Sequence, residues 1–428
     1  MKPSGPLLLL VLLAAAGLSR AQFRTSLLDL SGILPSLSRP ANHSRIFYAV
    51  MFDAGSTGTR IHVYTFIQKP LPVLDNEMFH SIKPGLSAYA DYPETAGETV
   101  RMLLKVAKKT VPRLDWKRTP LVLRATAGLR LLPAAKAQAL LDQVQLVFDE
   151  SPFLVPDNSV SIMNGTNEGI LAWISLNFLT GHLNAHATKT VGILDLGGGS
   201  TQITFLPKLR KTIESAPDDN YVARFDFLNS TFELYTHSYL GNGLMAARLS
   251  TLGALGAEGL EWQVFKSLCL PSKFRDDWSF GGLTYQVSGD QDGRAGYKPC
   301  YQEVLKVVKG IIHQPHELED SNVFYAFSYY FDRAVDAGLI SKYNVQGGTV
   351  RVRDFKKRAK EACNKMSEFP AVSPFLCMDL TYITCLLKDG FGFKDSTVLQ
   401  VREQSEEPCF MTQQSLLGWG SIVHWLVF

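Results

Sequence analysis

The segments D-A-G-S-T-G-T-R at residues 53–60 and D-L-G-G-G-S-T-Q at residues 195–202 share one arrangement. Each places an aspartate before a run of Gly, Ser and Thr, and each has β-branched or apolar residues on both sides. The pattern predicts a strand, a tight Gly-rich turn and a second strand, with the acid at the end of the first strand. Because the arrangement occurs twice, the sequence indicates an internal duplication with one hairpin in each half.

Strand and helix patterns alternate along the rest of the chain. Apolar residues recur at a spacing near 3.6 in residues 94–111, which predicts an amphipathic helix. Residues 119–130 are expected to form a short strand that runs into a Gly turn, and residues 133–148 and 168–179 are expected to be helices. This alternation predicts an α/β protein with covered sheets and a cleft between two related halves.

The composition is that of an ordinary globular protein with two or three domains. Of the 428 residues, 46% are apolar and 19% are charged, and the formal net charge is +3. The positive charges are too few and too dispersed to form a nucleic-acid-binding surface, so nucleic acid is not an expected partner.

The N-terminus predicts export. Lys2 precedes an apolar run at residues 7–18, and small residues precede a cleavage site after Ala21. We expect a signal peptide at residues 1–21, because its apolar run is too short to cross a bilayer core of ~30 Å. A loose leader is expected at residues 22–44. No later stretch reaches transmembrane length, so we expect the processed chain in the lumen of the endoplasmic reticulum, outside the cell, or both, without a stable membrane span.

Cysteines can form disulfides in that compartment. The chain has six, all in its C-terminal part, and no two have C-x-x-C spacing, so a zinc site is not expected. They are Cys269, Cys300, Cys363, Cys377, Cys385 and Cys409. N-glycosylation is expected at Asn42 and Asn229. The third sequon, at Asn164, lies inside a motif with another expected role.

The two Gly-rich turns are suited to phosphate. A turn without side chains lets its N–H groups approach phosphate oxygens closely, and the Ser and Thr hydroxyls add donors. The expected contacts are Gly55, Ser56, Thr57 and Gly58 in the first turn and Gly198, Gly199, Ser200 and Thr201 in the second. Asp53 and Asp195 would hold a divalent cation, Ca²⁺ or Mg²⁺, which favours oxygen ligands and bridges phosphate oxygens.

Other phosphate motifs do not fit the sequence. A P-loop pattern is absent, and neither turn is expected to open a helix, so the dinucleotide-binding pattern also fails. A single Asp-x-Gly segment is often a plain hairpin turn. Two copies, each with the acid, the glycines and a Ser-Thr pair, make that reading a poor account of this chain.

Hydrolysis also needs a base that orients and deprotonates water. Glu168, in the segment N-G-T-N-E-G-I-L-A-W, is the candidate. The alternative is an acid in the first turn of a helix, stabilised by the helix dipole. Residues 125–130, A-T-A-G-L-R, are likewise either a packing turn or a third phosphate contact through Thr126, with Arg130 nearby.

These four segments, in this order, resemble the apyrase-conserved regions of the ecto-nucleoside triphosphate diphosphohydrolase family. The resemblance runs from about residue 47 to about residue 400 and is closest to the soluble uridine and guanosine diphosphatase type of the endoplasmic reticulum. It implies the two-domain actin-like fold of sugar kinases, heat-shock chaperones and actin, related to ribonuclease H, with an active-site cleft between the domains.

The resemblance also implies roles for individual residues. Glu168 is similar to the family's general base. Asp53 and Asp195 are similar to its water-mediated metal holders, with Gln202 assisting, and Thr126 joins the phosphate contacts. Aromatic rings of the second domain stack on the nucleobase in this family, for which the candidates are Tyr330, Phe391 and Tyr382. Plain core packing is the alternative for each ring.

Family disulfides imply the pairs Cys269–Cys300 and Cys363–Cys377, with Cys385 and Cys409 unpaired or joined to each other. The resemblance places domain I at residues 45–166, completed by about residues 398–428, and domain II at residues 167–397. The tail at residues 414–428 lacks the Trp-x-Leu-Gly segment of the family, which puts the closing strand and helix of domain I in doubt.

The expected function is metal-dependent hydrolysis of a nucleoside diphosphate, UDP or GDP, to the monophosphate and phosphate. Removal of UDP in the secretory pathway would support protein glycosylation. The alternatives are an exopolyphosphatase or phosphotransferase of the same fold and a non-catalytic nucleotide-binding module. A mere binding module would not need Glu168. The chain is expected to be a monomer.

Overall fold

The computed structural model describes residues 46–68, 73–183, 189–227, 230–256, 263–291, 295–316, 318, 323–344, 347–366 and 373–402. The predicted signal peptide, the leader, the expected glycosylation sites Asn42 and Asn229, Cys409 and the tail lie outside these residues.

The first half of the chain forms a five-stranded sheet with the order β3-β2-β1-β4-β5. Its strands are β1 (Ile46–Ala54), β2 (Thr59–Ile67), β3 (Val73–Ile82), β4 (Leu121–Ala125) and β5 (Val160–Ile162). Neighbours β1, β2 and β3 pair antiparallel, whereas β1, β4 and β5 are parallel. The first predicted hairpin is therefore β1–β2.

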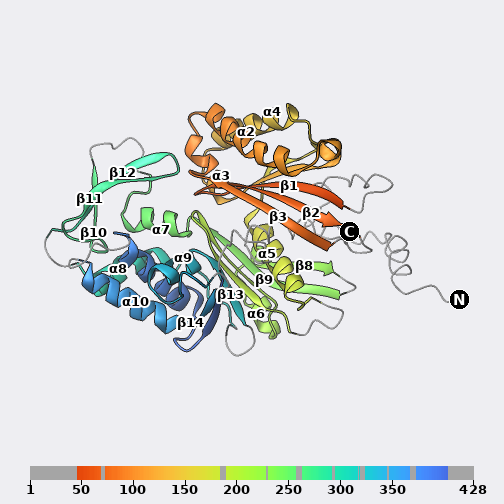
Figure 1. The fold of residues 1–428 in the computed structure, drawn as a ribbon. Coiled ribbons are helices and arrows are strands. Elements are labelled where there is room, and N and C mark those ends of the chain that lie inside the picture. The colour runs from red at the N-terminus through yellow and green to blue at the C-terminus, as the bar shows by residue number, and fades with distance from the viewer. Residues whose placement is uncertain are drawn as a thin grey trace.

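Helices α2 (Pro93–Thr110) and α4 (Ala134–Asp149) cover one face of this sheet (Figure 1). Proline at the first turn of α2 and two lysines in its last turn suit helix ends, because they match the free N–H groups and the dipole. The apolar stripes of both helices are buried in one cluster with the strands. The predicted helices at residues 94–111 and 133–148 are confirmed.

The second half repeats the topology of the first. Its seven-stranded sheet has the order β14-β15-β13-β6-β7-β9-β8. The strands are β6 (Gly192–Leu196), β7 (Ser200–Phe205), β8 (Val222–Phe227), β9 (Ser230–Leu240), β13 (Phe324–Ser328), β14 (Gly348–Arg351) and β15 (Val398–Val401). Strands β9-β7-β6-β13-β15 pair in the same senses as β3-β2-β1-β4-β5, so the predicted duplication is confirmed.

One predicted domain boundary is wrong at its start. Residues 398–401 were expected to complete domain I, but they form β15, which pairs with β13 and β14 in the second sheet. The repeated topology explains this placement, because β15 occupies the position that β5 has in the first half. The rest of that segment lies outside the described residues, apart from Arg402.

Helix α5 (Gly165–Leu179) lies between the two sheets. Its Trp173 is fully buried in a cluster that also contains Tyr64 and Phe66 from the first sheet and Phe225 and Phe232 from the second. The helix thus contributes to a core that both halves share, and it brings the chain from one half to the other.

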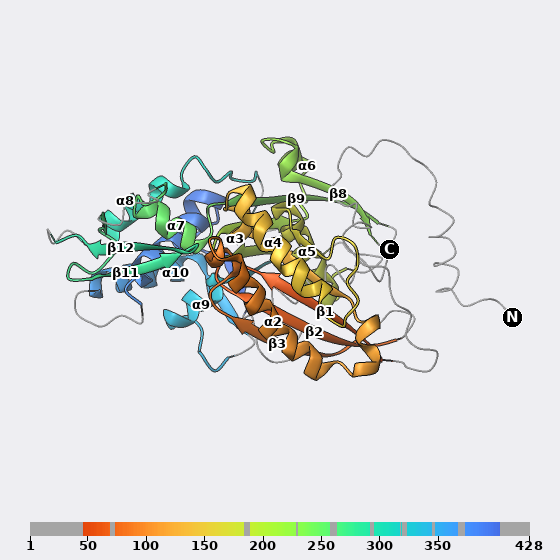
Figure 2. The same cartoon turned by 90° about the horizontal axis from the view of Figure 1, so that it is seen from above.

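The remaining elements cover the second sheet and extend beyond it (Figures 1 and 2). The helices are α6 (Arg210–Glu214), α7 (Leu244–Thr251), α8 (Tyr297–Val308), α9 (Tyr329–Asp336), α10 (Val352–Lys365) and α11 (Leu376–Cys385). A small sheet consists of β10 (Val264–Ser267), β11 (Arg275–Phe280) and β12 (Leu283–Gly289). Short helical segments are η3 (Leu86–Tyr89), α3 (Ala127–Arg130), η4 (Arg113–Arg118), η5 (Asp219–Tyr221) and η6 (Leu386–Phe391).

The predicted disulfides Cys269–Cys300 and Cys363–Cys377 are confirmed, and Cys385 is buried with a free thiol. Among the helices that the structure describes, none combines the length and the apolar character needed to cross a membrane.

Candidate active site

The two Gly-rich turns close in the same way. The Gly55 N–H donates to the Gly58 carbonyl and the Gly197 N–H donates to the Ser200 carbonyl, each at 3.0 Å. Asp53 lies opposite Arg60 in its hairpin, and Asp195 lies opposite Gln202. Both aspartates therefore stand where the first strand of a hairpin enters its turn.

The turns of the two halves contact each other. A Cβ atom on Gly198 would lie 2.4 Å from Ser56 Oγ, and one on Gly199 would lie 3.0 Å from the Cβ of Ala127. A Cβ atom on Gly128 would lie 2.8 Å from the Ser56 Cα. Glycine suits these positions because the first turn, α3 and the second turn lie within contact distance of one another.

Three acids lie buried at this meeting point. Asp53, Asp195 and Glu168 are 6%, 2% and 5% exposed. Burial raises the pKa of the Asp53 carboxyl, and the Arg60 guanidinium, 3.3 Å from it, opposes the shift. The pKa of Asp195 is raised well above its usual value by burial and by the charge of Glu168. Its hydrogen bond from Ser328 Oγ, at 2.9 Å, only partly offsets this.

This donor set fits a hard divalent cation. Gln202 Oε1 is buried and has no hydrogen-bond donor among the described residues. An unpaired buried oxygen costs free energy, which a cation or its water would relieve. Together with the Asp53 and Asp195 carboxylates, it supplies the oxygen ligands that Ca²⁺ and Mg²⁺ prefer.

Glu168 lies in the first turn of α5, as a helix acid would. Its carboxylate nevertheless contacts both halves of the molecule. Arg130 Nη2 donates to Glu168 Oε2 at 2.6 Å, and Gln202 Nε2 donates to the same oxygen at 3.2 Å. Burial raises the pKa of Glu168, and the Arg130 charge opposes that rise. The helix-dipole interpretation therefore accounts for only part of its environment.

The same network includes Ser200 and also Ser238, which the sequence did not indicate as a site residue. Arg130 Nη2 lies 3.3 Å from Ser200 Oγ, and Gln202 Nε2 donates to Ser200 Oγ at 2.8 Å and to Ser238 Oγ at 2.9 Å. A Cβ on Gly165 would lie 2.4 Å from Arg130 Nη1 and 2.5 Å from Ser238 Oγ. All four motifs of the sequence thus meet in one place.

Helix α7 supports the second turn from behind, which the sequence did not predict. The Leu244 N–H donates to the Gly197 carbonyl at 2.8 Å, and the Met245 and Ala246 N–H groups donate to the Gly198 carbonyl at 3.0 Å. These bonds engage the turn's carbonyl groups. They hold the backbone in the conformation in which its N–H groups are available for an anion.

The Ser and Thr side chains that were predicted to contact phosphate do not all lie in equivalent places. Ser56 lies at the junction of the turns, and Thr57 lies near the Tyr329 hydroxyl. The Thr126 N–H donates to the Ala54 carbonyl at 3.1 Å, which places this residue beside the first turn. Thr201 Oγ1 donates to the Asp195 carbonyl at 2.7 Å, so this hydroxyl serves the hairpin itself.

The three rings predicted to stack on a nucleobase are core residues. Tyr330 and Phe391 are fully buried, and Tyr382 is 1% exposed. The Tyr382 hydroxyl donates to the Asn242 carbonyl, and the Phe391 ring packs 6.1 Å from that of Tyr239. With no free ring face, these residues fit the alternative of core packing. The prediction failed because the apolar positions of α9, α11 and η6 face the interior.

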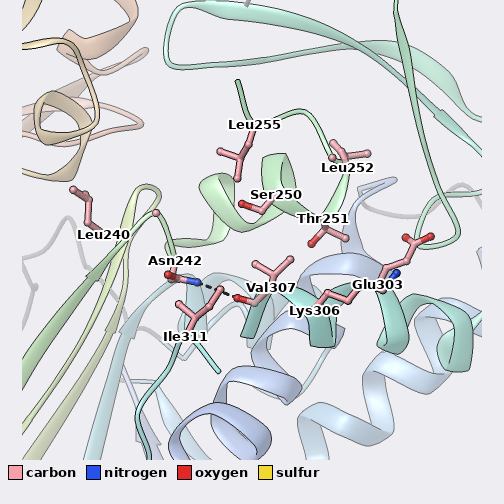
Figure 3. A pocket seen from close by; sticks show the side chains of 12 residues that line it. Leu240, Asn242, Ser250, Thr251, Leu252, Leu255, Glu303, Lys306, Val307 and Ile311 are labelled. Atoms are coloured by element: carbon pink, nitrogen blue, oxygen red, sulfur yellow. Dashed lines mark hydrogen bonds between the residues drawn. The ribbon is translucent and has the colours of Figure 1, made fainter. Parts of the chain in front are cut away.

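A hollow of about 650 Å³ lies beside the second turn, between the end of β9, α7 and α8 (Figure 3). The Gly241 N–H in its wall donates to the Gly199 carbonyl at 2.8 Å. Polar and charged groups alternate with apolar ones in the lining, which includes Asn242, Ser250, Thr251, Leu252, Glu303 and Lys306. The hollow therefore lies directly beside the second Gly-rich turn.

The fold is similar to that of a solved protein structure. A solved nucleoside triphosphate hydrolase from Neospora caninum aligns with a TM-score of 0.60 at 14% sequence identity, covering 90% of this chain and 93% of that one. The likeness confirms the two-domain actin-like fold expected from the motifs.

The sequence comparisons identify the family. The model of the GDA1/CD39 (nucleoside phosphatase) family matches residues 39–408, and the chain belongs to this family. Ectonucleoside triphosphate diphosphohydrolase 5 of Mesocricetus auratus is 57% identical over 94% of this chain and 86% of its own length. Nucleoside diphosphate phosphatase ENTPD5 of Homo sapiens is 58% identical over 87% of each chain.

Proposed function

We propose that this protein hydrolyses nucleoside diphosphates, UDP and GDP, to the monophosphate and inorganic phosphate. The observation that carries the proposal is the position of Glu168. Its carboxylate lies at the junction of both phosphate turns and is held by Arg130 from one half and Gln202 from the other. The names of the similar proteins, one of them a nucleoside diphosphate phosphatase, support the same substrate class.

In this mechanism the turns bind the two phosphates, and Glu168 orients a water molecule for in-line attack on the terminal phosphorus. The water loses its proton to the carboxylate as the new P–O bond forms. The bond to the bridging oxygen breaks, and the monophosphate leaves. The raised pKa of Glu168 makes it a stronger base than an exposed glutamate, while Arg130 fixes the carboxylate's orientation.

We propose that Asp53, Asp195 and Gln202 hold a divalent cation, Ca²⁺ or Mg²⁺, through coordinated water. The cation would neutralise phosphate charge during the reaction. The buried acids and the unpaired Gln202 oxygen support this assignment.

The nucleoside end of the substrate is assigned to the hollow beside Gly241. Phosphates gripped by the turns would place the sugar and base toward this hollow, because its wall is bonded to the second turn. The signal-like N-terminus supports action in the endoplasmic reticulum or outside the cell, where removal of UDP would favour protein glycosylation.

The test is phosphate release from UDP, GDP, UTP, UMP and polyphosphate, with and without EDTA, by the parent protein, by Glu168→Gln and by the control Glu214→Gln. Glu214 is an exposed acid in α6. We expect metal-dependent release from the diphosphates by the parent and the control only. Preferred cleavage of polyphosphate would favour the exopolyphosphatase alternative. Binding without release by the parent would favour the non-catalytic one.

A further inference from the structure

The β11–β12 hairpin extends from the second half of the molecule to the first (Figures 1 and 2). Phe280 and Leu283 form its last pair, so Gly281 and Gly282 make a two-residue turn. Their φ angles of 63° and 86° are those of a type I′ turn. This turn is the tip of the hairpin.

The two glycines of the tip differ in their surroundings. A Cβ atom on Gly281 would meet no atom within 4 Å, whereas one on Gly282 would lie 2.9 Å from the carbonyl oxygen of Ala88. Ala88 belongs to η3 in the first half. The turn geometry explains both glycines, but only Gly282 is also required by a contact between the halves.

The segment that the tip touches supports the first phosphate turn. A Cβ atom on Gly85, the residue before η3, would lie 2.2 Å from the Gly55 carbonyl oxygen. Ser87 Oγ would lie 3.0 Å from a Cβ on Gly128. A movement of η3 would therefore move the first turn with it.

The hairpin is firmly attached to the second half. The Cys269–Cys300 disulfide joins the segment before β11 to α8. The Phe375 ring of the second half packs 5.7 Å from Trp278 in β11 and 6.1 Å from Phe274, the residue before β11. These bonds and contacts make the hairpin move with its own half. The tip can therefore contact η3 only while the two halves are close together.

The cleft is closed where the tip is docked. Gly198 and Ser56 are in contact across the turns, and the Tyr329 hydroxyl of the second half lies near Thr57 of the first. A phosphate group cannot enter between surfaces in contact, so the halves must separate to admit substrate. We propose that the hairpin tip is a latch on η3 that holds the cleft closed and limits the fraction of molecules able to bind substrate.

The proposal predicts tighter apparent binding when the latch is weakened. The apparent dissociation constant equals the intrinsic constant divided by the binding-competent fraction, so a larger open fraction lowers it. Gly282→Asn retains a Gly-Asn turn but forces the tip away from Ala88. Gly281→Asn retains an Asn-Gly turn, also typical of type I′, and leaves the contact intact. The second variant is the matched control.

We expect Gly282→Asn to lower the KM for UDP by about threefold or more relative to Gly281→Asn. Hydrogen exchange of the amides of residues 86–89 should be faster in the same variant, because η3 loses a contact. The exchange measurement does not depend on the proposed UDP hydrolysis, so failure of that function can be told from failure of the latch. Equal KM and equal exchange in the two variants would overturn the latch. So would a raised KM, which would assign the contact to the substrate-bound state.

A locked variant tests the same idea in the opposite direction. Cysteines at both positions, Ala88→Cys with Gly282→Cys, should form a disulfide. A Cβ on Gly282 would lie 3.3 Å from the Ala88 Cα before any shift, so the small outward movement that the Ala88 carbonyl requires still leaves the two Cα atoms within the roughly 4.4–6.8 Å that a disulfide spans. The oxidised variant should lose UDP turnover, and mild reduction should restore it, because the native disulfides are buried. The parent protein under the same reductant is the control. Full turnover by the oxidised variant, with the cross-link verified by mass spectrometry, would overturn the proposal.

Discussion

The two Gly-rich hairpins have the same backbone pattern but different residues opposite their aspartates. Asp53 lies opposite Arg60, whose Nη1 is 3.3 Å from the carboxylate. Asp195 lies opposite Gln202 and accepts a hydrogen bond from the neutral Ser328 hydroxyl. The first hairpin thus supplies a positive charge to its own acid. The acid of the second hairpin has the neutral Gln202 opposite it and a neutral donor, Ser328, from β13.

This difference predicts unequal contributions of the two halves to cation binding. The pKa of Asp195 is raised well above its usual value, whereas the rise for Asp53 is opposed by Arg60. Arg60 is a smaller influence on Asp195 than on Asp53, and a buried carboxylate with less cationic compensation gains more from a bound metal ion. We infer that the second half contributes more to cation binding and that the first half tolerates its absence better.

The largest expected effect comes from Glu168, which contacts both halves. Glu168→Gln keeps the size and hydrogen bonding of the side chain but cannot accept a proton, so kcat for UDP should fall by about 10²-fold or more. Steady-state phosphate release checks this, with Glu214→Gln as the control. Near-parental turnover by Glu168→Gln would mean that the residue only joins the halves.

The next largest effect is the loss of Ca²⁺ affinity when one aspartate is replaced, which should differ between Asp53 and Asp195. Asp195→Asn should lower the affinity for Ca²⁺ by about 10- to 100-fold, and Asp53→Asn by less. Isothermal titration of the metal into each variant measures the effect without relying on turnover. Equal losses in the two variants would break the proposed division between the halves.

A smaller effect is expected when the first hairpin is given the residue of the second. Arg60→Gln removes a positive charge beside a cation site, so Ca²⁺ affinity should rise by about 3- to 10-fold at low salt. Arg101→Gln, which removes an exposed arginine from α2, should leave it unchanged. An affinity for Ca²⁺ that falls in Arg60→Gln would show that the guanidinium positions Asp53 for metal binding.

The smallest effect concerns the pH dependence of stability without metal. Asp53, Asp195 and Glu168 all have pKa values above their usual ones, so the folded state binds protons more readily than the unfolded state. Stability in EDTA should therefore fall as the pH rises from the usual carboxyl pKa through the folded-state value. Thermal melts should show a weaker fall in Asp195→Asn than in Asp53→Asn, and Ca²⁺ should reduce the fall in the parent. A pH dependence that is the same in both variants would contradict the ranking of the two acids.

Local sequence was sufficient to predict the parts of the site that lie in the motifs. Each hairpin is specified by its own glycines and alternating apolar residues, and each helix by its own periodicity. Ser238 and Ser328 could not be predicted, because they reach the site through pairing of β9 with β7 and of β13 with β6. Such pairings join residues far apart in the chain, and single strands do not show them.

The aromatic residues failed for a different reason. Tyr330, Tyr382 and Phe391 lie in segments whose aromatic and apolar residues form a buried helix face. The same pattern serves a core and a stacking platform, so sequence alone does not separate them. The hollow at Asn242 is made by three elements that approach only in the folded chain. The contact of β11–β12 with η3 could not be predicted either, because a Gly-Gly sequence indicates a turn whether or not that turn packs against another segment.

Helix α5 has a consequence for how the molecule melts. Its buried face completes a cluster that includes Met51, Tyr64 and Phe66 from the first sheet and Ile193 and Phe225 from the second. Loss of either sheet would expose this shared apolar surface to water, which is unfavourable for whatever remained folded. The two halves, although each repeats a complete topology, are therefore one cooperative unit. A calorimetric scan of the intact chain should show them leaving the native state together.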